Sequence, residues 1–159
     1  MADIISDGKT RVAWVSAIAN IAAPTTTELN AGILLHGTMT DDGLVNFRPT
    51  TSSVPNRKLD STFNTVDVGS VAVGDTALRF YKQDGTDTIY DTLVYLLGGF
   101  VVIRRSLAAS TAWASVQKLQ VWPGRCGELS WLDPETDTEE RYEIPIKITI
   151  QPNLRSVVA

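Results

Sequence analysis

Four isoleucines near the end of the chain alternate strictly with other residues, and this pattern constrains the fold more than any other feature. They occupy positions 144, 146, 148 and 150 and therefore fall on one face of an extended segment. A period of two predicts a strand with one buried face. Pro145 lies within this run, and because proline cannot donate a ladder hydrogen bond, it predicts an edge or bulged position. The chain is therefore built around a β-sheet.

Similar patterns predict further strands along most of the sequence. They cover residues 11–15, 33–40, 76–82, 100–104, 118–123, 125–131 and 141–150. The strand at 33–40 is expected to end at the turn Asp41-Asp42-Gly43, and an acidic turn over 133–140 is expected to join the last two strands.

Helical spacing appears at two places. Ile89, Leu93 and Leu97 repeat at helical intervals before Gly98-Gly99, which predicts a helix at about residues 87–97. Thr25 and Glu28 have capping-box spacing and predict one or two further turns closed by Gly32. The predicted fold class is a β-rich α+β domain spanning residues 1–159: a β-sandwich or barrel with one flanking helix at about 87–97.

Composition excludes several functions. With 14 basic and 18 acidic side chains, the formal net charge is -4, which disfavours a polybasic nucleic-acid binder. The single Cys126 permits no intrachain disulfide; it is either a buried inert thiol or a bridge between copies. The N-terminal residues lack a signal-peptide pattern, and the apolar stretch 93–103 is too short to span a bilayer. We therefore expect a soluble protein that is made in a reducing cytoplasm and does not insert into a membrane.

No catalytic constellation is found, so we expect neither an enzyme nor a cofactor or metal site. Gly8-Lys9-Thr10 lacks the other parts of a phosphate-binding loop, and the single His36 is expected to be a packed or surface residue. Of the six carboxylates between Glu128 and Glu140, five lie in the polar turn 133–140, where they repel one another and remain solvated. The four tryptophans are either core and interface residues or a sugar platform: Trp14, Trp113, Trp122 and Trp131.

Three segments are candidates for contacts outside the domain. Residues 1–10 form an N-terminal arm, and residues 44–68 form a long loop or hairpin whose polar, proline-containing part has no hydrophobic face. Whether this loop is solvated or an ordered contact arm stays open. Residues 151–159 are expected to leave the domain as a C-terminal arm after Pro152.

Several separated segments resemble one known family. The segments are Ala13 to Gly32, Phe80 to Leu93 with Gly99 to Arg105, and Lys118 to Pro123 followed by Gly127. Together they are similar to the major tail tube proteins of long-tailed, siphovirus-type bacteriophages, particularly those of actinobacterial hosts. The resemblance covers most of the chain apart from the 44–68 loop and the acidic turn.

This resemblance implies a structural role in the virion tail, after synthesis in the cytoplasm of a host bacterium. Subunits of the family form hexameric rings with a continuous inner β-barrel, and the rings stack into a hollow tube through which double-stranded DNA passes. The implied partners are other copies of the chain, a tape measure protein, a tail terminator and distal tail or baseplate proteins. The resemblance also favours a non-contractile tail.

Stacked rings need contacts that reach the next subunit, and the three segments above can supply them. The side chains expected to make inter-subunit contacts are Arg48, Arg57, Lys58, Leu154, Val157 and Val158. We expect acidic and small polar side chains to face the lumen, since acidic groups repel phosphate. The alternative function is a β-sandwich module of a phage particle that binds carbohydrate or a host surface.

Overall fold

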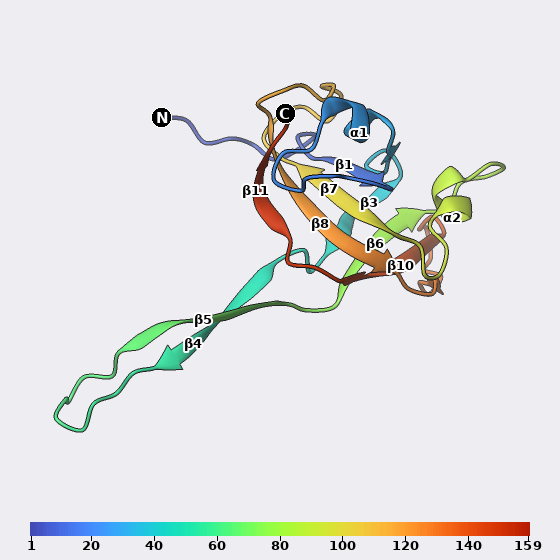
Figure 1. Cartoon of the computed structure of the whole chain (residues 1–159). Coiled ribbons are helices and arrows are strands. Elements are labelled where there is room, and N and C mark those ends of the chain that lie inside the picture. Colours follow the sequence, from blue (N-terminus) through green and yellow to red (C-terminus); the bar gives the residue numbers. More distant parts are fainter.

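The architecture is one large antiparallel sheet with a separate hairpin that projects from it (Figure 1). The computed structural model describes all of residues 1–159. The strands are β1 (Arg11–Val15), β2 (Ile33–Leu34), β3 (Met39–Val45), β4 (Pro49–Pro55), β5 (Val66–Val73), β6 (Thr76–Tyr81), β7 (Gly98–Arg104), β8 (Lys118–Cys126), β9 (Ser130–Trp131), β10 (Arg141–Ile148) and β11 (Asn153–Val157). The helices are α1 (Thr26–Asn30) and α2 (Thr88–Thr92).

The nine-stranded sheet curls around a core but does not close into a barrel. Its strand order is β2-β1-β7-β8-β10-β6-β3, with β11 beside β8 and β9 beside β10. The edge of β1 that β3 would need for closure is already occupied by β2, through the pairs Ala13–Leu34 and Trp14–Ile33. The β-rich prediction is confirmed, whereas the barrel alternative is wrong because the sheet stays open. The predicted fold class has one flanking helix, and the structure has two short ones, the first of them at the predicted capping box.

The central strands are buried on both faces, so alternate residues enter different cores. On β1, Val12 and Trp14 enter a core that also contains Phe80 and Ile144, whereas Ala13 and Val15 face the opposite side. The second core is covered by α1, the C-terminal strand and the segment that joins β7 to β8. This double burial explains why all five residues of β1 are buried.

The first helix forms where the capping box predicts it. The Thr25 hydroxyl accepts a hydrogen bond from the Glu28 amide at 3.2 Å, and the Glu28 carboxylate accepts from the Thr25 amide at 2.8 Å. The carboxylate also accepts from the Ala19 amide. These amide donors lower the pKa of Glu28.

The second helix is shorter than the predicted range of 87–97. It ends at Thr92, because the backbone of the next turn joins the sheet instead. The Leu96 amide donates to the Cys126 carbonyl, and the Cys126 amide donates to the Leu97 carbonyl. Gly98 and Gly99 do not stop a helix but begin β7, where a side chain at Gly99 would collide with Trp14.

The predicted turn at Asp41–Gly43 lies inside strand β3. Asp42 accepts a hydrogen bond from the Arg79 guanidinium at 2.6 Å and one from the Thr40 hydroxyl at 2.7 Å, which hold this segment beside β6. The register shifts between Met39 and Leu44, so the extra residues form a bulge and not a chain reversal. The strand prediction for 33–40 is therefore wrong in its boundaries.

Of the two positions predicted for Pro145, an edge or a bulge, the edge is wrong, because β10 lies between β8 and β6. The Pro145 carbonyl accepts from the Gly127 amide, in the gap where β8 has ended and β9 has not begun. In a β-strand the nitrogen and carbonyl of one residue point to the same side. The proline nitrogen therefore faces this gap, where no ladder hydrogen bond is required of it.

The last nine residues do not leave the body of the protein after Pro152. They form β11, which pairs with the first half of β8, and the Ser156 hydroxyl donates to the Ile21 carbonyl. Ser156 and Val158 are buried, and Val158 belongs to the second core. The segment is thus a strand of this chain's own sheet, because it pairs with β8 and buries Ser156 and Val158.

Deleting residues 151–159 is therefore expected to destabilise the fold. The deletion removes a strand and the side chain of Val158, and it uncovers apolar surface at a cost of about 3 kcal/mol or more. For a chain of this size we expect Tm to fall by about 10 °C in a thermal unfolding experiment. Deleting the exposed residues 1–5 is the control and should leave Tm unchanged; equal melting of both truncations would contradict the assignment.

Asp87 begins α2 and is a buried carboxylate with several donors. It accepts from the amides of Gln83 and Tyr90, each at 3.1 Å, and forms an ion pair with Lys82 at 3.5 Å. Burial alone would raise the pKa of Asp87, but the two amides and the Lys82 ammonium outweigh it and lower the pKa below its ordinary value of 3.8. The charged form is therefore favoured in the folded state.

Asp87→Asn is expected to lower the free energy of unfolding at pH 7 by about 2 kcal/mol. A lowered folded-state pKa contributes stability above the unfolded value and loses it as the pH falls below 3.8. The difference between wild type and variant should therefore shrink between pH 5 and about pH 2 in urea titrations. The exposed Asp84→Asn is the control, and a difference that is independent of pH would contradict the role of the charge.

Candidate assembly surfaces

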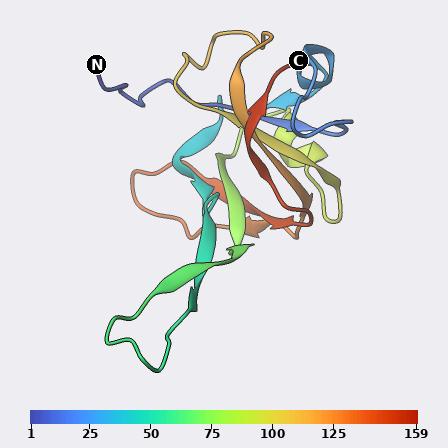
Figure 2. The same cartoon turned by 60° about the vertical axis from the view of Figure 1, so that its left-hand side comes forward.

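The hairpin β4–β5 carries an apolar face that the rest of the chain leaves uncovered. Thr51 pairs with Val71, Ser53 with Val68 and Pro55 with Val66, so these residues share one face of the hairpin. Figures 1 and 2 both show the hairpin projecting away from the body. The exposed fractions of Val66, Val68 and Val71 are 67%, 77% and 53%. These three valines are called the valine face below.

A bulge at Gly69 and Ser70 brings the valines into phase. Val66 and Val68 occupy even positions and Val71 an odd one, so unbroken alternation would place them on opposite faces. The register shift lets Gly69 and Ser70 together oppose Ser52, and the Ser52 and Ser70 hydroxyls lie 3.2 Å apart on the other face. A side chain at Gly69 would collide with Ser52, which explains the glycine.

Three predicted contact residues flank this hairpin. Arg48 precedes β4, and Arg57 and Lys58 lie in the connection between its strands; all three are exposed. None of them takes part in the five ion pairs of the chain. The structure therefore brings these cations to the base and the far end of the hairpin and pairs them with no carboxylate.

The C-terminal contact candidates occupy three different environments. Val158 is buried in the second core, so its side chain is not presented to a neighbour. Leu154 is half-buried against the first core, and Val157 is exposed on the outer side of β11. Of these three side chains, only Val157 and part of Leu154 are accessible to a neighbouring subunit.

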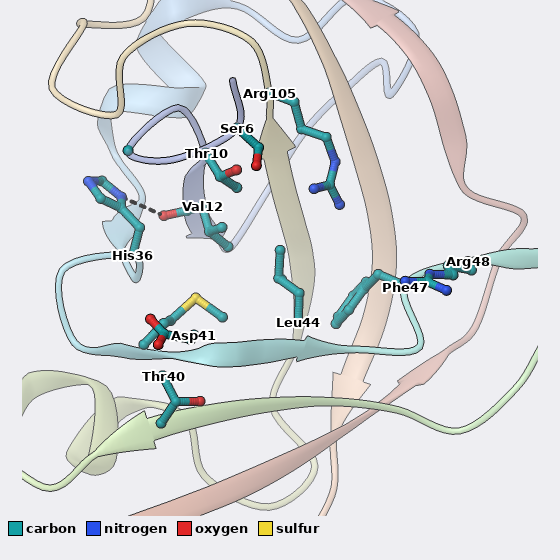
Figure 3. A pocket seen from close by; sticks show the side chains of 12 residues that line it. Ser6, Thr10, Val12, His36, Thr40, Asp41, Leu44, Phe47, Arg48 and Arg105 are labelled. Atoms are coloured by element: carbon teal, nitrogen blue, oxygen red, sulfur yellow. Dashed lines mark hydrogen bonds between the residues drawn. The ribbon is translucent and has the colours of Figure 1, made fainter. Parts of the chain in front are cut away.

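The open seam of the sheet between β1 and β3 contains a cavity of about 470 Å³. Figure 3 shows Leu44 and Arg105 pointing into it from opposite sides, with Val12 and His36 nearby. The His36 ring nitrogen lies 3.4 Å from the Val12 carbonyl, and no hydrogen bond joins it to the Ser6 or Thr10 hydroxyl. These residues form no nucleophile–base pair.

The other residues considered for chemistry are dispersed. No three histidine, cysteine, aspartate or glutamate side chains gather as a metal site. Trp14, Trp113 and Trp122 are buried, and Trp131, with 48% of its surface exposed, packs beside Tyr90 with ring centroids 5.9 Å apart. The tryptophans therefore form no continuous platform. Neither helix has the length and apolar composition that a membrane crossing requires.

A pair of buried arginines was not predicted from the sequence. Arg11 and Arg104 lie opposite each other on β1 and β7, and both guanidinium groups stack on the Trp113 ring, at 4.9 and 5.1 Å from its centroid. They donate to the carbonyls of Ala108, Ala109 and Ala112 and so hold the β7–β8 connection. Burial lowers the pKa of both groups, and repulsion by Arg11 adds to the effect at Arg104.

Cys126 is the buried free thiol that the sequence allowed, and burial raises its pKa to about 11. Since the thiolate is the reactive form, we expect the folded protein to resist alkylation by iodoacetamide at pH 8 and to react fully in about 6 M guanidinium chloride. Mass spectrometry gives the labelled fraction. Rapid labelling of the native protein would contradict this burial.

The fold and these surfaces define a β-rich structural subunit with uncovered surfaces, without an assembled catalytic site. The chain belongs to the family of phage tail tube proteins, whose model matches residues 1–159. It is therefore a structural component of the virion tail.

Comparison with solved structures agrees with this fold. A chain in the six-fold symmetrised cryo-EM structure of the anti-feeding prophage baseplate superimposes with a TM-score of 0.62 over 98% of both chains. The two sequences are 10% identical, so this likeness shows the fold alone. A comparison with curated protein sequences finds no significant match.

Proposed function

We propose that this protein forms hexameric rings that stack into the hollow tail tube of a siphovirus-type phage with a non-contractile tail, as in phages of actinobacterial hosts. The single observation that carries the proposal is the exposed valine face. A two-stranded hairpin is marginally stable alone, and burying a valine side chain contributes about 1.5–3 kcal/mol. The hairpin is thus ordered best when a neighbouring subunit covers it.

The unpaired sheet edges support the same proposal. The edge strands β2 and β3 leave backbone groups without a ladder partner. Such edges promote aggregation of a monomer, but in an assembly a strand of a neighbouring subunit can pair with them. Strands supplied by neighbours would join six open sheets into the inner barrel of a ring. The likeness to a chain from a six-fold symmetrised assembly supports this symmetry.

The proposed partners follow from this role. Besides other copies of itself, the subunit contacts a tape measure protein inside the tube, a terminator at one end and baseplate proteins at the other. Double-stranded DNA passes through the lumen, and the net charge of -4 suits a wall to which DNA does not adhere. The exposed cations Arg48, Arg57 and Lys58 serve contacts between stacked subunits.

The valine face gives a direct test. We expect the double variant Val68→Asp/Val71→Asp to remain folded, because both side chains are exposed, and to lose assembly, because two carboxylates would be buried at the contact. Negative-stain microscopy and sedimentation velocity measure rings and tubes, and circular dichroism measures folding.

Ala72→Asp is the matched control, since Ala72 is exposed on the opposite face of the same hairpin. It should assemble like wild type. Rings or tubes from the valine variant at wild-type yield would rule out the hairpin contact, and a wild-type protein that stays monomeric at every concentration tested would rule out the proposed function.

A further inference from the structure

A groove on the body of the protein is lined by three cations and has an apolar floor. Arg105 follows β7, Lys118 begins β8 and Arg155 lies on β11; together they line a cavity of about 540 Å³. The floor includes Leu154 and Val157 from β11. This feature is called the basic groove below.

The cations of the basic groove have no carboxylate partner within the chain. All three side chains are exposed, and the five ion pairs use only Arg79, Lys82, Arg141 and Lys147 as cations. A protein with a net charge of -4 thus concentrates unpaired positive charge at one site. Three unpaired cations beside apolar side chains fit an acidic peptide segment that also carries apolar atoms.

The same chain contains such a segment. The loop Asp133–Glu140, called the acidic loop below, has five carboxylates, and every residue in it is exposed. Only Glu135 forms an ion pair, with Arg141 at 3.2 Å. The remaining four carboxylates are unpaired, and the loop also contains Pro134, Thr136 and Thr138, whose carbon atoms can contact an apolar floor.

Within one molecule, the acidic loop and the basic groove lie on different parts of the surface and do not pair with each other. The acidic loop follows β9, whose Trp131 packs beside Tyr90 of α2, and the Lys82 amide donates to the carbonyl of Glu140. The basic groove lies instead along β11 and the start of β8. Figure 1 shows α2 and β11 on opposite sides of the body.

We propose that the acidic loop of one copy binds in the basic groove of the next copy. The inference rests on the proposed self-assembly and specifies one of its contacts. Because loop and groove are different surfaces, the contact is head-to-tail, and each molecule offers one free loop and one free groove. Repetition of this contact links every copy to two neighbours, as a ring or a stack requires.

Nucleic acid fits the basic groove less well than the acidic loop does. Three cations neutralise few phosphates, and the surrounding chain is net negative. The apolar floor of Leu154 and Val157 has no counterpart on a phosphate backbone, whereas Pro134 and the threonine methyl groups of the loop match it.

Charge reversal on each side tests the pairing. The groove variant is Arg105→Glu/Lys118→Glu/Arg155→Glu, which changes the charge of the groove from +3 to -3. The loop variant is Asp133→Lys/Asp137→Lys/Glu139→Lys/Glu140→Lys, which changes the charge of the loop from -5 to +3. We expect each variant alone to need at least about tenfold more protein than wild type to assemble, because like charges then face each other. An equimolar mixture of both variants should recover assembly to within about twofold of wild type, since the reversed groove now accepts the reversed loop.

Controls separate this pairing from general charge effects and from unfolding. Asp84→Lys/Asp91→Lys also replaces exposed carboxylates with lysines, at positions outside the acidic loop, and should assemble like wild type. All variants are melted by circular dichroism to verify folding. Assembly is measured by sedimentation velocity and negative-stain microscopy at low salt, and wild-type assembly should weaken as salt screens the contact.

The outcomes distinguish the inference from the function on which it rests. If wild type forms rings or tubes and both charge variants form them at the same concentration, the loop–groove contact is wrong while the tail tube function stands. The contact is equally wrong if the mixture fails to recover assembly, or if the groove variant assembles normally and loses only a measured affinity for duplex DNA. A wild type that never assembles overturns the proposed function together with the contact.

Discussion

Burial of the central strands on both faces is the constraint on which the rest of the structure depends. In β1, β7 and β8, alternate side chains enter two separate cores. The curled remainder of the sheet covers one of them. The other has no second sheet above it, so α1, the β7–β8 connection and β11 must supply its cover through residues such as Leu29, Trp113 and Val158. Segments that look peripheral in the sequence are therefore structural.

The buried arginines follow from the same constraint. Arg11 and Arg104 lie at the ends of two doubly buried strands, where the segment that covers the second core passes over them. A carboxylate partner is missing, so stacking on Trp113 and hydrogen bonds to carbonyl groups compensate part of the desolvation cost. The two arginines thus fix the connection that leads into Lys118 and the basic groove.

Sequence patterns predicted most of the sheet because alternation is a local property. They located the cores of β6, β7, β8 and β10, and capping-box spacing located α1. They failed where a partner strand decides the backbone. The sequence places Leu96 and Leu97 in a helix, but in the structure their backbone groups form hydrogen bonds with Cys126 instead. Asp41 to Gly43 have the composition of a turn, but Arg79 binds Asp42 and holds this segment beside β6. Pro145 is tolerated inside the sheet only because the strand beside it is interrupted.

The valine face illustrates the same limit at the proposed functional surface. The polar, proline-containing part of the 44–68 segment shows no hydrophobic face, and this remains true of β4 taken alone, whose residues are mostly hydroxyl-bearing. The face arises only when β5 pairs with β4 and the bulge at Gly69 brings Val71 into phase with Val66 and Val68. A hairpin that gathers three valines on one face and Ser52, Asp67 and Ser70 on the other, held away from the body, directs its association toward one side. A subunit that must polymerise in an ordered way needs that directionality, because an apolar strip exposed on both faces would aggregate without register.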